Sequence, residues 1–199
     1  EGNDISGNFA DNATISGTIA DPGVYDSGTL TVEWGDGTST SYPYAAGTAS
    51  FLRDHRYADD GTYFVTVYAE DEDGGLSAAT LTTVTVTNAP PAVTISTPPA
   101  EEGVPASVSI NVFDAGQLDS FTVILTWGDG TTTRQTVGPG ATGGGVPDGN
   151  GGFTYTFTHP YVGEGTYTLT VRVNDDDGGF VTETAQVAVS NAAPVVTAT

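Results

Sequence analysis

Short runs in which apolar and polar residues alternate dominate the chain. In the first half the clearest runs cover residues 14–19, 29–34, 62–68 and 78–87. Alternation with a period of two is typical of strands that bury one face. Gly, Pro, Asn and Asp are frequent between the runs, as expected for turns. The pattern predicts an all-β fold of short antiparallel strands.

The second half carries the same pattern. Its clearest runs cover residues 107–112, 121–127, 166–173 and 180–190. No stretch of ten residues has apolar positions at the spacing of a helix face, and Thr, Val and Gly are abundant, which suits strands and turns. Strands of this number and spacing predict a Greek-key sandwich of about seven strands in each half.

A repeated motif divides the chain into two modules. Residues 30–38, Leu-Thr-Val-Glu-Trp-Gly-Asp-Gly-Thr, return as residues 123–131, Val-Ile-Leu-Thr-Trp-Gly-Asp-Gly-Thr. A His-x-Tyr, a Gly-Thr-Tyr and an acidic segment ending in Gly-Gly follow in both copies. Repetition of this kind marks separate structural units. It predicts one module at 1–89, a second at 90–191 and a remainder at 192–199.

The second copy is longer because it carries an insertion. Residues 138–152 hold this insertion and are rich in Gly. A segment of this composition predicts a flexible surface loop.

Aromatic residues stand at the same places in both copies. Trp34 and Trp127 lie at the buried third-strand position of an immunoglobulin-like sandwich, and we expect each to anchor a core. Tyr63 and Tyr167, each preceded by Gly-Thr, occupy the position of that fold's tyrosine corner.

These motifs together resemble a known family. Trp-Gly-Asp-Gly-Thr, His-x-Tyr, Gly-Thr-Tyr-x-(Val/Leu)-Thr-Val and an acidic turn ending in Asp-Gly-Gly are similar to the PKD domain, and both copies carry them. The resemblance implies two tandem immunoglobulin-like antiparallel β-sandwiches. It names no single function, because such modules occur in surface-layer proteins, in adhesins and as accessory domains of secreted hydrolases.

The composition excludes several classes of function. The chain has no Cys and no Met, which removes disulfides and thiolate chemistry. Its net charge of −21, from 25 acidic residues and four Lys and Arg, repels nucleic acid and anionic lipid and favours cations. No apolar run is long enough to insert into a membrane.

Two histidines invite a catalytic interpretation. His55 and His159 lie at equivalent places, each two residues before a Tyr, and no nucleophile or orienting carboxylate stands at a fixed spacing from them. We expect packed, hydrogen-bonded side chains, and we expect no enzyme activity.

Acidic clusters point to a calcium site. In this topology three segments share one pole of each module: the loop after the first long strand, the turn between the last two strands, and the chain leading into the first strand. Oxygen ligands from such loops suit Ca²⁺, which the resemblance also implies, because collagenase modules of the family bind it there. The alternative is that the acids only cap turns and face water. The candidate ligands are Asn88, Asp114, Asp119, Asp175 and Asp177, with Asp21, Asp26, Asp71 and Asp73 in the first module.

The ends of the two modules differ. Residues 91–96, Pro-Ala-Val-Thr-Ile-Ser, read as the first strand of the second module, and the first module has no equivalent in the sequence. Residues 193–199 repeat that strand pattern with no module behind it. Either the chain is a window on a longer array, or Val195, Val196 and Thr197 of one copy complete the first module of the next, as in strand-addition assemblies.

The sequence therefore favours a non-catalytic structural or adhesive module of a cell-surface protein or extracellular filament. Its expected partners are neighbouring modules or copies of itself, joined head-to-tail, with a polysaccharide or protein ligand as a further partner. The alternative is an accessory substrate-binding or spacer module of a secreted hydrolase, which would display a row of exposed aromatic side chains.

Overall fold

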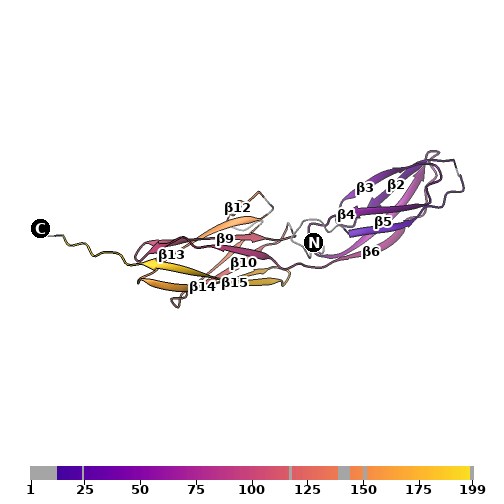
Figure 1. The fold of residues 1–199 in the computed structure, drawn as a ribbon. Helices are drawn as coiled ribbons and strands as arrows, with labels where there is room; N and C mark the ends of the chain where they lie inside the picture. The colour runs from indigo at the N-terminus through magenta and orange to yellow at the C-terminus, as the bar shows by residue number, and fades with distance from the viewer. Residues whose placement is uncertain (1–12, 24, 117, 139–143, 150–151, 198–199) are drawn as a thin grey trace. The chain divides into compact units, whose positions relative to one another are not determined.

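A computed structural model describes residues 13–23, 25–116, 118–138, 144–149 and 152–197. The chain forms two compact units, Glu1–Asn88 and Ala89–Thr199. Every regular element in the described part of either unit is a β-strand (Figure 1). No helix among these residues is long and apolar enough to cross a membrane.

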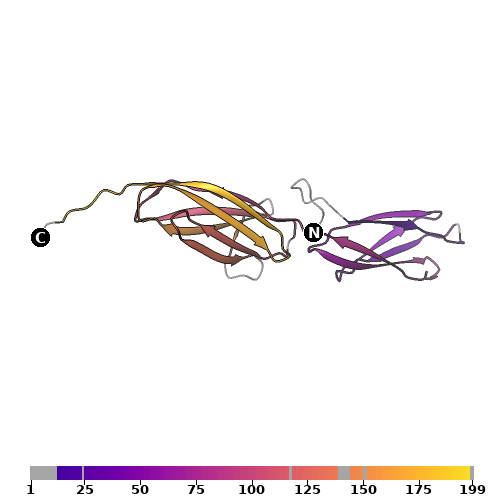
Figure 2. The same cartoon turned by 90° about the horizontal axis from the view of Figure 1, so that it is seen from below.

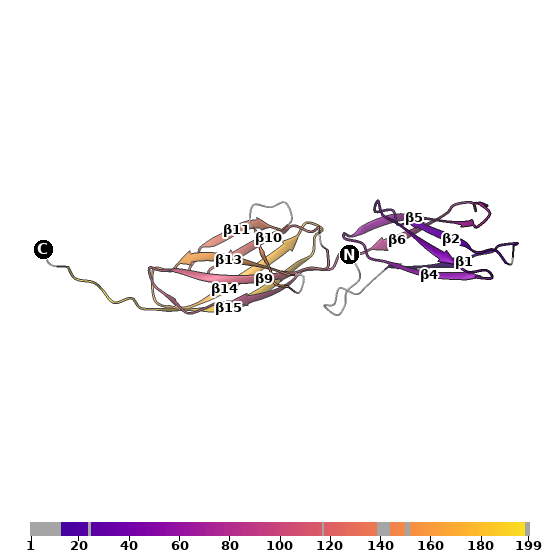
Figure 3. The same cartoon turned by 90° about the horizontal axis from the view of Figure 1, so that it is seen from above.

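The first module contains two sheets. The larger has the order β3-β2-β5-β6, and β1 pairs antiparallel with β4 in the smaller, where the two strands lie side by side (Figure 3). The strands are β1 (Ala13–Thr18), β2 (Gly28–Glu33), β3 (Ser39–Tyr44), β4 (Ser50–His55), β5 (Gly61–Asp71) and β6 (Thr80–Val86).

The second module has the same plan with more strands. One sheet has the order β11-β10-β14-β15-β8, and the other has the order β12-β13-β9-β7, so that two layers form a sandwich (Figure 2). The strands are β7 (Ala92–Ser96), β8 (Ala100–Glu101), β9 (Pro105–Phe113), β10 (Phe121–Thr126), β11 (Thr132–Val137), β12 (Val146–Pro147), β13 (Phe153–Pro160), β14 (Gly165–Asp175) and β15 (Phe180–Ser190).

Alternation builds a separate core in each module. In β10 the side chains of Phe121, Val123 and Leu125 are buried, and the residues between them are less so. They pack against the buried face of β9, as a sandwich requires. The first module has its own cluster around Leu30 and Val32. The all-β class and the sandwich fold are confirmed.

The predicted aromatic anchors are confirmed. Trp34 and Trp127 are fully buried, and each carbonyl oxygen accepts a hydrogen bond from a buried tyrosine hydroxyl, Tyr57 at 2.9 Å and Tyr161 at 3.0 Å. Tyr63 and Tyr167 form tyrosine corners, because their hydroxyls donate to backbone carbonyls four residues upstream, each at 2.9 Å.

One detail differs from the sequence prediction. The Gly-rich segment 138–152 was expected to be loop throughout, but Val146 and Pro147 form strand β12, which pairs with the start of β13, so the prediction is wrong for these two residues. Pairing needs only backbone groups, which the local composition does not reveal. Strand β7 forms at residues 92–96 as expected. Whether the first module has a strand equivalent to β7 would depend on residues 1–12, which lie outside the described residues.

Candidate functional site

The acidic end of the second module is built by two turns. Strand β9 ends at Phe113, and the Asp114 side chain then accepts a hydrogen bond from the amide of Gly116 at 3.1 Å, which closes an Asx turn. In the turn between β14 and β15, Asp175 Oδ1 accepts hydrogen bonds from the backbone amides of Asp177 at 3.1 Å and Gly179 at 2.6 Å. Both turns therefore hold a carboxylate at a set position.

Three carboxylates at this end are buried. Asp114, Asp119 and Asp175 have exposed fractions of 8%, 2% and 8%. Burial raises the pKa of Asp114 to about 7, and the charges of Asp119 and Asp175 act in the same direction against the Gly116 amide. The Oδ2 atom of Asp114 is buried and finds no hydrogen-bond partner among the described residues. Buried carboxylates whose charges raise the pKa of a neighbour form an environment that favours a cation.

A second group of acids borders this cluster. Carboxylate oxygens of Asp119, Asp176 and Asp177 lie within 4.8 Å of one another. Asp176 was not among the predicted ligands. The backbone amide and the hydroxyl of Ser120 donate to its two oxygens, at 2.9 and 3.2 Å, so it ties the turn to the loop before β10.

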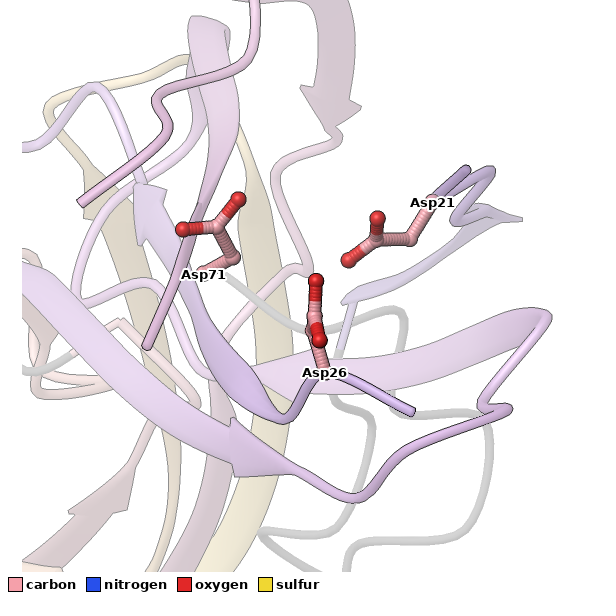
Figure 4. A group of neighbouring side chains, drawn as sticks. All are labelled: Asp21, Asp26 and Asp71. Carbon is pink, nitrogen blue, oxygen red and sulfur yellow. The ribbon is translucent and has the colours of Figure 1, made fainter. Parts of the chain in front are cut away.

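The first module repeats this arrangement. Carboxylate oxygens of Asp21, Asp26 and Asp71 lie within 4.8 Å of one another, and Figure 4 shows the three side chains converging, two from the loop between β1 and β2 and one from the end of β5. Asp21 accepts the Gly23 amide at 2.9 Å, and Asp71 accepts the Gly75 amide at 2.7 Å. Burial and the neighbouring Asp21 charge raise the pKa of Asp26. All three are half-buried, whereas their counterparts in the second module are buried.

Among the predicted ligands, Asp73 does not join the first-module group, and Asn88 is assigned to a different unit from its predicted partners. The Asp73 side chain is exposed, and its contribution to the turn is a backbone amide that donates to Asp71 at 3.0 Å. Asn88 belongs to the first compact unit, whereas the acids that it was predicted to join belong to the second. Their role as ligands stays a prediction, as it does for the other candidates.

Each histidine packs on a tryptophan. The His55 ring stacks on Trp34 with ring centroids 4.5 Å apart, and its Nε2 lies 2.7 Å from Asp36 Oδ2. The second module has the same stack between His159 and Trp127, with centroids 4.6 Å apart. The histidines are therefore packed and hydrogen-bonded, as predicted.

The His159 group is unsuited to nucleophilic catalysis. Its Nε2 lies 2.6 Å from Asp129 Oδ2 and 3.3 Å from Thr131 Oγ1, so both partners share one ring nitrogen. A catalytic triad uses the two ring nitrogens separately, one for the nucleophile and one for the carboxylate. The Thr131 hydroxyl donates to Asp129 at 2.6 Å instead. Although desolvation opposes it, the hydrogen bonds from Thr131 and His159 lower the pKa of Asp129 to about 2.

The turn that carries Asp129 depends on two glycines of different kinds. Gly128 has a φ of +85°, and a Cβ there would lie 2.7 Å from the Thr168 carbonyl oxygen. Gly130 has a φ of +94° but has nothing within 4 Å. Gly130→Ala is expected to lower the free energy of unfolding by about 1 kcal/mol, from backbone strain alone. Gly128→Ala is expected to cost about 2 kcal/mol, because the backbone must also move.

Urea denaturation of the two variants separates these effects. Equal losses of stability would contradict the close approach of Gly128 to β14. The same comparison applies to the first module, where a Cβ at Gly35 would lie 2.6 Å from the Phe64 carbonyl oxygen and Gly37 has open space.

Comparison with known proteins identifies the second module. The family model described as PKD domain matches residues 92–189. No curated protein is similar enough in sequence to be matched. The PKD domain of an M14-like peptidase from a Thermoplasmatales archaeon is 24% identical, with a TM-score of 0.40, over 52% of this chain and 98% of that one.

A second solved structure is similar over most of the chain. It is described as a tetra-tandem repeat in the extending region of a large adhesion protein, and it is 18% identical with a TM-score of 0.51. The similarity covers 95% of this chain and 48% of that one, so the chain spans about half of the adhesion fragment. At this identity the likeness shows the fold alone.

Proposed function

Residues 92–189 belong to the PKD domain family, and from that premise we propose that the chain is a non-catalytic structural or adhesive part of an extracellular protein. The first module would be a second copy of the same domain, as the repeated motifs indicate. Modules would follow one another in a surface protein or filament, along one chain or by strand donation between chains.

One observation carries this proposal: each module has a core of its own. The buried residues form two clusters, one within 15–86 and one within 106–189. Residues 87–91 alone separate β6 from β7, so successive domains follow after a short linker. An array of independently folded domains joined by short linkers is long and stays extended, as expected of a protein that extends from a surface. The similar adhesion fragment is itself described as an extending region.

The exposed side chains favour a structural role over substrate binding. A module that holds a hydrolase on polysaccharide would present a planar row of aromatic rings, but both tryptophans are buried. In the second module, the exposed Phe153 and Phe180 lie on strands of different sheets, β13 and β15. The Phe180 ring is also covered by the Arg172 guanidinium at 3.9 Å.

Calcium would stiffen the acidic end of each module. Support comes from the second module, where the buried Asp114 Oδ2 has no hydrogen-bond partner in the described part of the chain and the charges of Asp119 and Asp175 raise the pKa of Asp114. A hard cation would relieve the repulsion between these groups, and Ca²⁺ accepts six to eight oxygen ligands in irregular geometry. The triad of Asp21, Asp26 and Asp71 would hold a second ion. Bound ions would resist local opening of the loops.

The proposal predicts location and mechanical behaviour. Antibodies raised against the chain are expected to label intact, unpermeabilised source cells or filaments shed from them. Single-molecule extension of the chain should give two separate unfolding events, each releasing roughly 3.3–3.6 Å for every residue of one module. Labelling only after permeabilisation, or one concerted unfolding event, would contradict the proposal.

A further inference from the structure

The second module shows how a complete domain closes its open side. Strand β7 runs antiparallel along β9, with Val93 opposite Val112 and Ile95 opposite Ile110. The chain then crosses to the other sheet, where β8 pairs parallel to β15. The Thr97 hydroxyl donates to the Gln186 carbonyl at 2.9 Å and so fixes the crossing. One extended segment therefore joins both sheets.

In the first module the corresponding edges have no such segment among the described residues. Strand β1, the counterpart of β9, pairs only with β4, and β6, the counterpart of β15, pairs only with β5. An unpaired strand edge presents free backbone donors and acceptors and is a template for another strand.

A groove lies between these edges. It has a volume of about 770 Å³ and is lined by residues of all six strands, β1 to β6, and by the loop residues next to β1 and β6. Its apolar lining includes Ile15, Leu30, Phe51, Val67 and Val84. We call this space the acceptor groove. It extends along the face that β7 and β8 cover in the second module.

The core of the first module is open where the groove runs. Val84 is half-buried, whereas Val187, at the same place on β15, is fully buried. At the other edge, Ile19 is likewise half-buried, whereas its counterpart Val112 is buried. Apolar side chains left half in water lose part of the free energy that burial would supply. The apolar lining of the groove is therefore less covered than the same face of the second module.

The chain itself contains a segment similar in sequence to the one that covers this face in the second module. Residues 190–197, Ser-Asn-Ala-Ala-Pro-Val-Val-Thr, match residues 87–94, Thr-Asn-Ala-Pro-Pro-Ala-Val-Thr, which lead into β7. Val195 and Val196 are 88% and 91% exposed. After β15 these residues leave the second module as an extended segment (Figures 1, 2 and 3). Two adjacent valines exposed in this way are suited to strand addition.

We propose that the acceptor groove binds the segment 194–197 of a second copy of this chain, antiparallel to β1. The ladders of the two modules are in the same register, because Ala13 pairs with His55 as Ala106 pairs with His159. Val196, at the place of Val93, would then lie opposite Ile19. The contact joins unlike surfaces, so each copy can donate to one neighbour and accept from another, head-to-tail. This inference rests on the succession of modules proposed above, and it identifies the surfaces through which one copy of the chain would contact the next.

The test uses the full chain with Val196→Asp, which cannot donate its own strand, as the acceptor. A synthetic peptide of residues 190–199 is expected to bind it, to raise the melting temperature of the first module, and to protect the amides of β1 and β6 from hydrogen exchange. Val196→Asp in the peptide should weaken binding about tenfold or more, because a charge would enter an apolar groove.

Sedimentation of the intact chain gives the second readout. The weight-average mass should rise with concentration for the unaltered chain and for Val162→Asp, whose valine is exposed in a turn outside the segment. It should stay at the monomer value for Val196→Asp. A monomeric unaltered chain that ignores the peptide would overturn the proposal. So would a peptide that binds only after residues 1–12 are removed, since the groove would then be filled from the same chain. Surface labelling and two-step extension would be unaffected by either result.

Discussion

Replacing Trp34 with Ala is expected to unfold the first module while the melting transition of the second stays in place. Trp34 is fully buried and anchors a core that does not include any residue of the second module. Truncating a buried Trp to Ala costs about 3–5 kcal/mol. A module of this size has a total stability of about 5–15 kcal/mol, so the loss moves its transition far down in temperature. Trp127→Ala should have the reciprocal effect.

Differential scanning calorimetry of the two variants measures both transitions in one experiment. Phe64→Ala serves as the control, because this aromatic side chain is in the same module but is exposed, and its loss should change stability by only about 0.5 kcal/mol. If Trp34→Ala and Trp127→Ala each lowered both transitions equally, the two cores would be one cooperative unit. The proposed array of independent domains would then lose its basis.

The fold was predictable because the repeated motifs and the alternation of apolar and polar residues both indicate two modules with strands at equivalent positions. Eight runs of alternating residues correspond to eight observed strands, with bounds that differ by at most a few residues. The less apolar strands were harder to see. Strand β3, Ser-Thr-Ser-Tyr-Pro-Tyr, buries only Tyr44 fully and lies at the edge of its sheet, so no apolar alternation marks it. Edge strands are held by one neighbour, and sequence pattern records burial rather than pairing.

The acidic site was predictable in position but not in detail. The repeat aligns Asp21 with Asp114 and Asp26 with Asp119, and the Greek-key order brings both loops to one pole, which the structure bears out for the first-module triad. Which acids enter the cluster depends on turn geometry, which is why Asp73 stays exposed. Asp176 lies in the acidic run predicted at this pole but was not chosen as a ligand, although an acid and a partner serine recur at that place as Glu72 and Ser27, whose side chains lie 2.6 Å apart.

The depth of burial was not predictable at all. Nothing in the local sequence distinguishes the half-buried Asp21 from the buried Asp114, since both begin Asx turns. The difference accompanies the open side of the first module, where Val84 and Ile19 are also less buried than their counterparts in the second module. The acceptor groove and the less buried acidic cluster therefore both belong to the less covered module.

Calcium is expected to raise the melting temperature of the second module strongly at pH 8 and weakly at pH 5.5. Calcium at one hundred times its Kd would stabilise the module by about 2.7 kcal/mol. This is roughly 10–20 °C for a domain of this size. The pH dependence follows from Asp114, whose raised pKa of about 7 leaves it protonated at pH 5.5 and unable to bind the ion. Thermal melts in calcium and in chelator, at both pH values, measure the effect.

The metal-free protein should show the opposite trend with pH. An aspartate in the unfolded chain ionises near pH 4, whereas folded Asp114 keeps its proton until about pH 7. Between these values the folded state binds more protons, so stability in chelator should fall as the pH rises, by a few kcal/mol at most, of the order that such a shift allows. Calcium should cancel this fall at pH 8.

Asp114→Asn tests the assignment because it should act in opposite directions in the two conditions. The amide keeps an oxygen for the Gly116 hydrogen bond and removes the buried charge, so the variant should melt higher than the unaltered chain in chelator at pH 8 and respond little to calcium. Glu164→Gln removes one exposed charge at the other end of β14 and should change neither property. A calcium response that survives in Asp114→Asn, or a melting temperature that ignores chelator in the unaltered chain, would exclude the buried aspartates as a calcium site.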